Sequence, residues 1–131
     1  MNTTSNSWAQ NIFAITLFAE DLDKAKQFYQ NIFGLPLLFE DNNSAVFKIG
    51  DAHINLLKTS AAGELVSPAT VGSPDAGPRL VFTIHVDDVD AMCAELTARG
   101  VELLNGPMDR PWGIRTASFK DPGGHIWEIA K

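Results

Sequence analysis

The feature of this chain that most constrains its fold is an internal repeat between its two halves. The segment FAEDLDKAKQFYQNIFGLPLL at residues 18–38 resembles the segment HVDDVDAMCAELTARGVELL at residues 85–104. In both segments an apolar pattern of helical period ends near a glycine, Gly34 or Gly100, as a left-handed helix C-cap prefers. Two halves with one pattern are expected to form the same supersecondary unit, so we expect two related modules.

Each repeat predicts a strand followed by a capped helix. The strands are expected at Ile12 to Phe18 and at Leu80 to Val86. Asp21 and Asp88 then stand where a carboxylate accepts hydrogen bonds from the unpaired N–H groups of a helix start. Apolar residues at three- and four-residue spacing give each helix one core-facing stripe. The stripes are Leu22, Ala25, Phe28, Tyr29 and Ile32, and Val89, Met92 and Leu96.

Three further strands are expected after each helix. They are Pro36 to Glu40, Ser44 to Ile49 and His53 to Lys58 in the first half, and Val101 to Leu104, Ile114 to Lys120 and His125 to Ala130 in the second. The order βαβββ, found twice, predicts an α+β domain with modules at about 11–59 and 79–131. Residues 60–78, SAAGELVSPATVGSPDAGP, are rich in Gly, Pro and Ser, so we expect a loop that is either a flap over a site or a linker.

Size and composition limit the class of protein. The 131 residues suit a single domain, and no apolar run approaches the ~20 residues that cross a bilayer, so no membrane partner is expected. The start MNTTSNSWAQN lacks the features of an export signal, which predicts a cytoplasmic location. The net charge of −6 repels phosphate backbones, so nucleic acid is not an expected partner. Cys93 is the single cysteine, which excludes an internal disulfide.

Three stretches, in this order of elements, carry a resemblance to a known family. They are EDLDKAKQFYQNIFGLPL, VDDVDAMCAELTARGVEL and PWGIRTASFKDPGGHIWEI. The chain resembles the glyoxalase, bleomycin-resistance and extradiol-dioxygenase superfamily, also called vicinal oxygen chelate proteins. The resemblance implies curled mixed sheets that form a shared cleft, helices on the outer faces, and a homodimer. Function then depends on the residues that line the cleft.

The resemblance also implies where a metal would bind. Metal-dependent members place four ligands in the cleft, usually His or Glu, and these positions fall here on Ala14, Asn55, Val81 and Glu128. Ala14 and Val81 carry no ligating atom, and Asn55 is a weak donor. A site for Zn, Ni, Fe or Mn needs about three His or carboxylate ligands. We therefore expect no metal and no other cofactor.

Glu128 raises a question, because it lies between Trp127 and Ile129 in an apolar run that predicts a strand. A carboxylate taken out of water is costly unless it gains a partner or a proton. Glu128 is therefore interpreted in one of three ways: as a solvated side chain, as a metal ligand, or as a polar contact that orients an organic ligand.

Side-chain alternation identifies the neighbours of these positions on the cleft face. They are Ile12, Thr16 and Phe18 on the first strand, His53 before Asn55, and Thr83 and His85 on the strand of Val81. This mixture of aromatic, apolar and hydrogen-bonding groups suits a small organic molecule better than a bare ion. The two histidines leave open a metal site displaced along the strands, although roughly 3.3 Å per residue makes the displacement large.

The segment PWGIR adds two candidate ligand contacts. It resembles the tryptophan–glycine motif of the bleomycin-resistance branch, which lies near the ligand groove there. Trp112 is expected to stack on a flat or cationic ligand, or else to pack against its own loop. Arg115 is expected to contact an anion or to pair with Glu128 across the cleft. His125, beside the DPGG turn, is expected to face away from Glu128.

Three functions remain in competition. The first is a metal-free protein that binds a small organic molecule, such as a cationic aromatic compound, in the cleft. The second is a metal-dependent enzyme, either a glyoxalase-type lyase or isomerase or a ring-cleaving dioxygenase, which the residues Ala14 and Val81 disfavour. The third is a metal-free enzyme in which Glu128 is the catalytic base.

Overall fold

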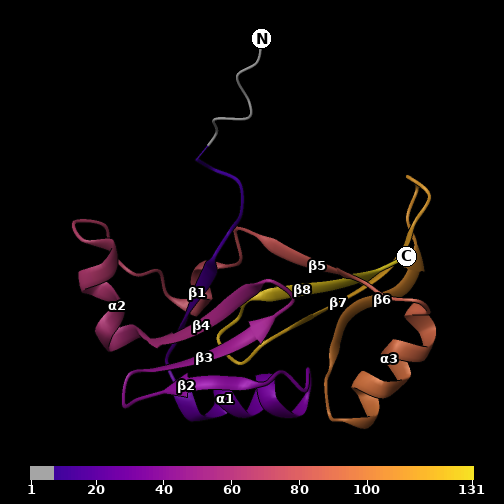
Figure 1. Cartoon of the computed structure of the whole chain (residues 1–131). Coiled ribbons are helices and arrows are strands. Elements are labelled where there is room, and N and C mark those ends of the chain that lie inside the picture. The colour runs from indigo at the N-terminus through magenta and orange to yellow at the C-terminus, as the bar shows by residue number, and fades with distance from the viewer. Residues whose placement is uncertain (1–7) are drawn as a thin grey trace.

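The computed structural model describes residues 8–131; residues 1–7, which hold most of the segment searched for an export signal, lie outside the described part. The elements follow one another as β1 (Ala14–Ala19), α1 (Leu22–Asn31), β2 (Leu37–Glu40), β3 (Ser44–Ile49), β4 (Ala52–Lys58), α2 (Thr59–Val66), the 3₁₀ turn η2 (Pro74–Ala76), β5 (Val81–His85), α3 (Val89–Ala98), β6 (Leu103–Asp109), β7 (Arg115–Lys120) and β8 (Ile126–Ala130). The chain is thus α+β, with a βαβββ unit in each half (Figure 1). No helix in the described part is long and apolar enough to cross a membrane.

The two modules form two four-stranded sheets of the same topology. Their strand orders are β1-β4-β3-β2 and β5-β8-β7-β6. In each sheet the first strand pairs in parallel with the last, and the other pairs are antiparallel. The sequence repeat is therefore a structural repeat, and equivalent positions of the modules occupy equivalent places in the sheets.

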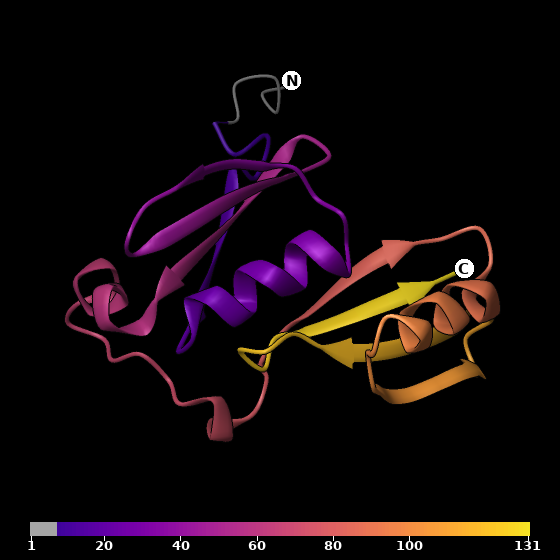
Figure 2. The ribbon, with the colours of Figure 1, turned by 90° about the horizontal axis from the view of Figure 1, so that it is seen from below.

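Helices α1 and α3 lie on the same side of the molecule, and each covers one face of a sheet (Figure 2). Helix α1 packs between the two sheets: the ring of Tyr29 is 6.0 Å from the ring of Phe47 in β3 and 6.1 Å from that of Trp127 in β8. The buried residues of both modules form one hydrophobic cluster. The helix-covered faces thus share a core, and the opposite faces of the sheets are left open.

The predicted helix caps are confirmed. The carboxylate of Asp21 accepts a hydrogen bond from the backbone N–H of Lys24, and that of Asp88 accepts one from Ala91. Gly100 has a φ of +89°, a left-handed conformation that a residue with a Cβ rarely adopts. The local signals at helix ends were therefore sufficient to place both helices.

The predicted bounds of β6 are wrong. The strand spans Leu103–Asp109, whereas the sequence predicted Val101 to Leu104. Proline is tolerated in β6 because it is an outermost strand, and the pairing register shifts there. Gly106 is required at this shift, since a Cβ would lie 2.5 Å from the carbonyl oxygen of Thr116.

The predicted loop at 60–78 is also partly wrong, because its first residues belong to helix α2. The low helix propensity of Gly63 concealed this helix in the sequence. Packing supplies the missing stability, since Ala62 is fully buried while α2 contacts β4 and β1.

Candidate functional site

The register of β1 and β4 builds the first half of the candidate site on the open face of the first sheet. Ala14 lies opposite His53, and Thr16 lies opposite Asn55. The amide nitrogen of Asn55 donates a hydrogen bond to the hydroxyl of Thr16 over 3.3 Å. The side-chain oxygen Oδ1 of Asn55 is buried and, among the described residues, has no hydrogen-bond partner. A buried acceptor without a partner is costly, so this oxygen is a natural contact for a donor on a ligand.

A hollow of about 390 Å³ lies above this pair of strands. Aromatic and aliphatic side chains form most of its wall, and its polar groups are few. The ring of His53 lies 4.7 Å from that of Phe13, and its Nδ1 is 3.2 Å from the Phe13 carbonyl oxygen, which fixes the imidazole in place. The lining residues are Phe13, Ala14, Leu38, Phe39, Ser44, Val46, His53 and Asn55, and all belong to the first module.

Glu128 lies at the equivalent place on the second sheet. It stands opposite Thr83 on β5 and opposite Ser118 on β7. The hydroxyl of Thr83 donates a hydrogen bond to Oε1 of Glu128 over 2.9 Å. Glu128 is only half-buried, and the side chains on either side of it, Trp127 and Ile129, point into the core. The carboxylate in the apolar run is therefore an open-face residue held by one hydroxyl, with its second oxygen available to a ligand.

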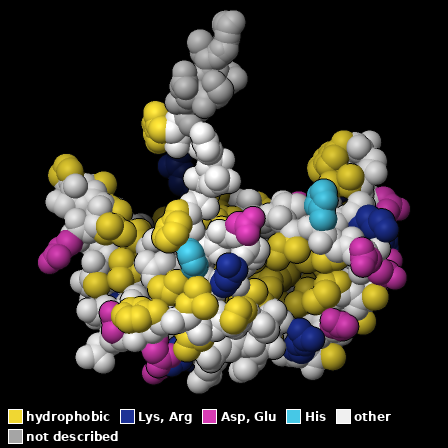
Figure 3. Space-filling model, viewed as in Figure 1, with side chains coloured by type: hydrophobic (Ala, Val, Ile, Leu, Met, Phe, Trp, Pro, Cys, Tyr) yellow, Lys and Arg dark blue, Asp and Glu magenta, His cyan; other side chains and the backbone are white. Residues whose placement is uncertain are grey.

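The remaining face residues are distributed over different parts of the surface. Phe18 lines a separate hollow of about 240 Å³ beside Pro74 and His125. His85 is exposed and lies opposite Ala130 at the far end of β5. The structure therefore brings Thr16, His53 and Asn55 together, pairs Thr83 with Glu128, and leaves Phe18 and His85 outside both groups. Hydrophobic side chains cover much of the middle of the face that Figure 3 shows.

Trp112 lies in the turn between β6 and β7, beyond the end of β8, and is 68% exposed. The guanidinium of Arg110 lies 5.9 Å from the centre of its ring, a contact that the sequence did not predict. Arg110 also donates hydrogen bonds to Thr116 and Asn105, so it is fixed by the hairpin. Trp112 is thus presented at the tip of a hairpin rather than beside Glu128.

The predicted pairing of Arg115 with Glu128 is wrong. Arg115 forms ion pairs with Asp90 at 2.9 Å and Asp109 at 3.0 Å instead. Its hydrogen bond to Asp90 holds the pKa of that carboxyl below its usual value. Arg115 is the first residue of β7, and its contacts join that strand to helix α3. The guanidinium therefore links β7 to α3 and β6 within the second module.

The donor set at the family's metal positions does not fit a metal. Ala14 and Val81 supply no donor atom, and Asn55 offers only a neutral amide oxygen, which is a weak ligand. Among residues 8–131, no group of three or more His, Cys, Asp or Glu side chains lies close enough to hold an ion. Glu128 alone offers a strong ligand at these positions, which is fewer than the about three that a transition metal needs.

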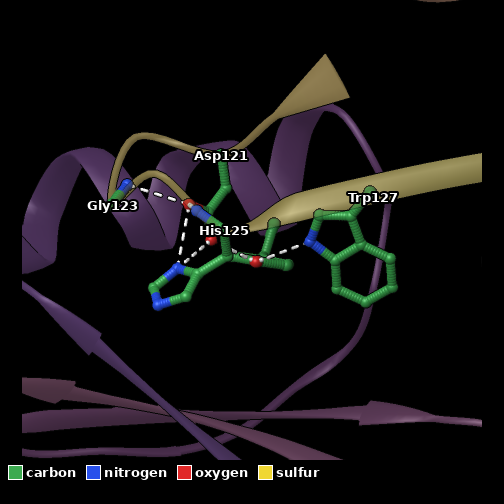
Figure 4. Close-up of polar contacts among 5 residues, drawn as sticks. Asp121, Gly123, His125 and Trp127 are labelled. Carbon is green, nitrogen blue, oxygen red and sulfur yellow. Dashed lines mark hydrogen bonds and ion pairs between the residues drawn. The ribbon is translucent and has the colours of Figure 1, made fainter. Parts of the chain in front are cut away.

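Sequence reasoning missed a buried polar network that joins the two modules (Figure 4). The hydroxyl of Tyr29 in α1 donates to Asp121 over 2.5 Å and accepts from the indole N–H of Trp127 over 3.1 Å. The carboxylate of Asp121 also contacts Nδ1 of His125 and accepts from the backbone N–H of Gly123. Burial, followed by the charge of Asp121, raises the pKa of the Tyr29 hydroxyl far above its ordinary range.

No local pattern could have found this network. Tyr29 read as one more residue of an apolar helix stripe, and Asp121 read as the start of the DPGG turn. His125 was expected to lie beside the DPGG turn, facing away from Glu128; its contact with a carboxylate that is almost fully buried was not predicted, and 23% of its side chain is exposed. Tyrosine and aspartate 92 residues apart become partners only once the modules are packed together.

Comparison with known proteins places these features in a family. The sequence model of the glyoxalase/bleomycin resistance protein/dioxygenase superfamily matches residues 11–129. The Bacillus subtilis (strain 168) protein YraH is 32% identical over 124 residues, which cover 92% of this chain and 97% of that protein. The metallothiol transferase FosB of Lysinibacillus sphaericus (strain C3-41) is 28% identical over 122 residues, covering 92% of this chain and 81% of FosB.

A crystal structure from Nocardioides, described as a glyoxalase/bleomycin resistance protein/dioxygenase, has the same fold. It superposes with a TM-score of 0.82 at 26% identity, over 92% of this chain and 82% of that one. The paired βαβββ modules are therefore shared with proteins of that description.

Proposed function

Because this chain belongs to the glyoxalase/bleomycin resistance protein/dioxygenase superfamily, we propose that it binds a small organic molecule on the open faces of its sheets without a metal ion. The observation that carries the proposal is the oxygen Oδ1 of Asn55, which is buried beside an aromatic hollow without a partner. Such a group gains a hydrogen bond when a ligand with a donor enters, while Phe13 and Phe39 supply apolar contact.

A ligand that is flat and positively charged fits the charges and rings of these faces best. The carboxylate of Glu128, held by Thr83, attracts a cation, and the chain as a whole carries a net charge of −6. Aromatic rings at Phe13, Phe39 and Trp112 offer faces for stacking or for a cation–π contact. The hydrogen-bond acceptors Asn55 and Glu128 would orient the molecule.

We further propose that two copies of the chain complete each site. The hollow at Asn55 is lined by the first module, whereas Glu128 lies on the second sheet. A second copy that presents its second sheet to this hollow would place an aromatic wall and a carboxylate on either side of one ligand. This arrangement gives both open faces a function in one site.

An enzymatic function is the second candidate, and the similarity to the metallothiol transferase FosB favours it. A metal-dependent version conflicts with Ala14 and Val81, which supply no ligand. A metal-free version would use Glu128 as a base, since its carboxylate lies on the open face of the second sheet, where a substrate could reach it. The metal-dependent version predicts turnover that requires a metal, and the metal-free version predicts turnover without one. Simple binding predicts neither.

A titration with cationic aromatic probes that carry N–H donors, such as ethidium and benzamidinium, tests the proposal. Asn55→Leu, Trp112→Ala and Glu128→Gln are each expected to weaken binding by about threefold to a hundredfold, from the loss of a hydrogen bond to a polar or charged group or of a stacking contact. Glu64→Gln in α2 is the control, because it removes the same charge as Glu128→Gln from an exposed helix position. Thermal unfolding should be nearly unchanged in Trp112→Ala, Glu128→Gln and Glu64→Gln, whose side chains are exposed or half-buried.

The same samples separate the alternatives. The proposal expects binding that persists after treatment with a chelator, and elemental analysis without about one Zn, Ni, Fe or Mn per chain. Equal affinity in all variants would place the site elsewhere. A stoichiometric metal that is lost in Glu128→Gln would contradict metal-free binding and favour the enzyme.

A further inference from the structure

A second groove lies on the outer, helix-bearing side of the molecule, away from the open sheet faces. Its volume is about 550 Å³, within the range of sites that hold small organic molecules. It runs between helix α1, the segment that joins α3 to β6, and the end of β7. We name it the outer groove; both modules contribute to its walls.

The outer groove collects positive charge on an acidic chain. Lys24, Arg99 and Lys120 line it, although the whole sequence has 10 Lys and Arg against 16 Asp and Glu. Among the described residues, the ammonium groups of Lys24 and Lys120 meet no carboxylate, whereas Lys26 on the same helix pairs with Glu40. Within the described part of the chain, Lys24 and Lys120 thus form no ion pair.

The two carboxylates that line the groove do not cancel this charge. Asp121 is buried and already bonded to Tyr29 and His125, so its oxygens point into the molecule. Glu102 is exposed and is the single acidic side chain of the groove wall outside that network. The third cation, Arg99, forms an ion pair with Glu95 at 3.8 Å, outside the groove wall, and donates to the carbonyl oxygen of Ile32 over 2.7 Å, which holds its guanidinium at the junction of the modules.

The rest of the wall is mixed: the amides of Gln27 and Asn31 are polar, and beside them lies an apolar strip. Ile32, Val101 and Leu104 contribute aliphatic surface, and Leu104 is 49% exposed. A bare phosphate or sulfate would leave this surface in water, and an uncharged hydrocarbon would leave the lysines unused. The combination favours a ligand with an anionic head and an apolar body.

We propose that the outer groove is a second binding site, for small amphipathic anions such as aliphatic carboxylates or phosphate monoesters. Lys24 and Lys120 hold the anionic head, and Ile32, Val101 and Leu104 cover the aliphatic body. This site is separate from the open sheet faces, and its ligand has the opposite charge to the one proposed there.

Titration of the full chain with decanoate and decyl phosphate below their micelle concentrations, followed by backbone amide NMR, tests the proposal. Both probes are expected to shift the backbone amides of residues 24–32, 99–104 and 120–121. Decyltrimethylammonium, which has the same alkyl chain and the opposite charge, is not expected to shift them. Lys24→Gln and Lys120→Gln should each weaken binding about two- to tenfold, more at low salt than at high salt. Glu102→Gln should strengthen it.

Lys26→Gln is the matched control, because it removes one charge from the same helix outside the groove. Its affinity for decanoate should equal that of the unaltered chain. The proposal is overturned if the cationic probe binds as well as decanoate, if Lys24→Gln and Lys26→Gln behave alike, or if the shifted amides lie on the open faces. Preference for one head group over the other would identify whether carboxylate or phosphate is the better ligand.

Discussion

At the scale of single residues, the hydroxyl of Tyr29 has the largest structural role. It is fully buried, donates to Asp121 and accepts from Trp127, and so joins α1 of the first module to the turn and last strand of the second. The buried carboxylate of Asp121 is stabilised by this donor together with the backbone N–H groups of Gly123 and His125. A charge taken out of water needs such partners, so each of them carries part of the cost of burying Asp121.

Tyr29→Phe is therefore expected to destabilise the protein by about 1.5–3 kcal/mol, the usual contribution of a hydrogen bond to a charged group. The ring is retained, so the aromatic packing against Phe47 and Trp127 should survive. Chemical denaturation followed by tryptophan fluorescence measures the free energy of unfolding. Combining Tyr29→Phe with Asp121→Asn in a double-mutant cycle isolates the pair. Additive effects of the two changes would show that the hydrogen bond contributes nothing.

At the scale of elements, local signals predicted most of the chain because caps and periodicity act over a few residues. Asp21 and Asp88 fixed the helix starts, and β3 agrees with its predicted bounds, Ser44–Ile49. Helix α2 was missed because Gly63 and its small neighbours carry no strong pattern, and its stability comes from burial of Ala62 against distant strands. Elements whose stability depends on packing are those that the sequence alone does not show.

Gly63→Ala is expected to stabilise the protein by about 0.5–1 kcal/mol, because alanine suits a helix interior better than glycine. The structure leaves room, since a Cβ on Gly63 meets no described atom within 4 Å. Gly100→Ala is the matched control: it has equal space, but its φ of +89° makes a Cβ unfavourable, so stability should fall. The midpoint of thermal unfolding measures both. Stabilisation by both changes, or by neither, would contradict the helix at Gly63.

At the scale of the whole molecule, alternation along the strands predicted which side chains share a sheet face but not how they are grouped. Thr16 lies opposite Asn55 and Thr83 lies opposite Glu128, and these pairs are set by the register of adjacent strands, which the sequence did not predict. The partners of Arg115 were not predictable, since Asp90 and Asp109 reach it through the packing of α3 and β6 on β7. Pairing between elements that are distant in the chain is set by the assembled fold.

The chain is expected to be a homodimer, because large apolar side chains remain on its surface and two copies would complete the proposed site. Those of the open faces include Phe13, Leu38, Phe39 and Val81, which are 51–75% exposed. Sedimentation should give twice the chain mass of 14.2 kDa at micromolar concentration. Val81→Glu should raise the dissociation constant about tenfold or more, since it places an unpaired charge in the interface. A stable monomer of the unaltered chain would contradict the prediction.

The network at Tyr29 has a consequence for the order in which the protein acquires its structure during synthesis. Tyr29 leaves the ribosome 92 residues before Asp121, and Trp127 follows later still. Until the last strand emerges, the rings of Phe28 and Tyr29 in α1 and of Phe33 just after it have only the first sheet to cover them. The growing chain thus exposes an aromatic surface until β8 has been made, a stage at which incomplete chains are prone to aggregate. A chain that stops short of β8 cannot close this core.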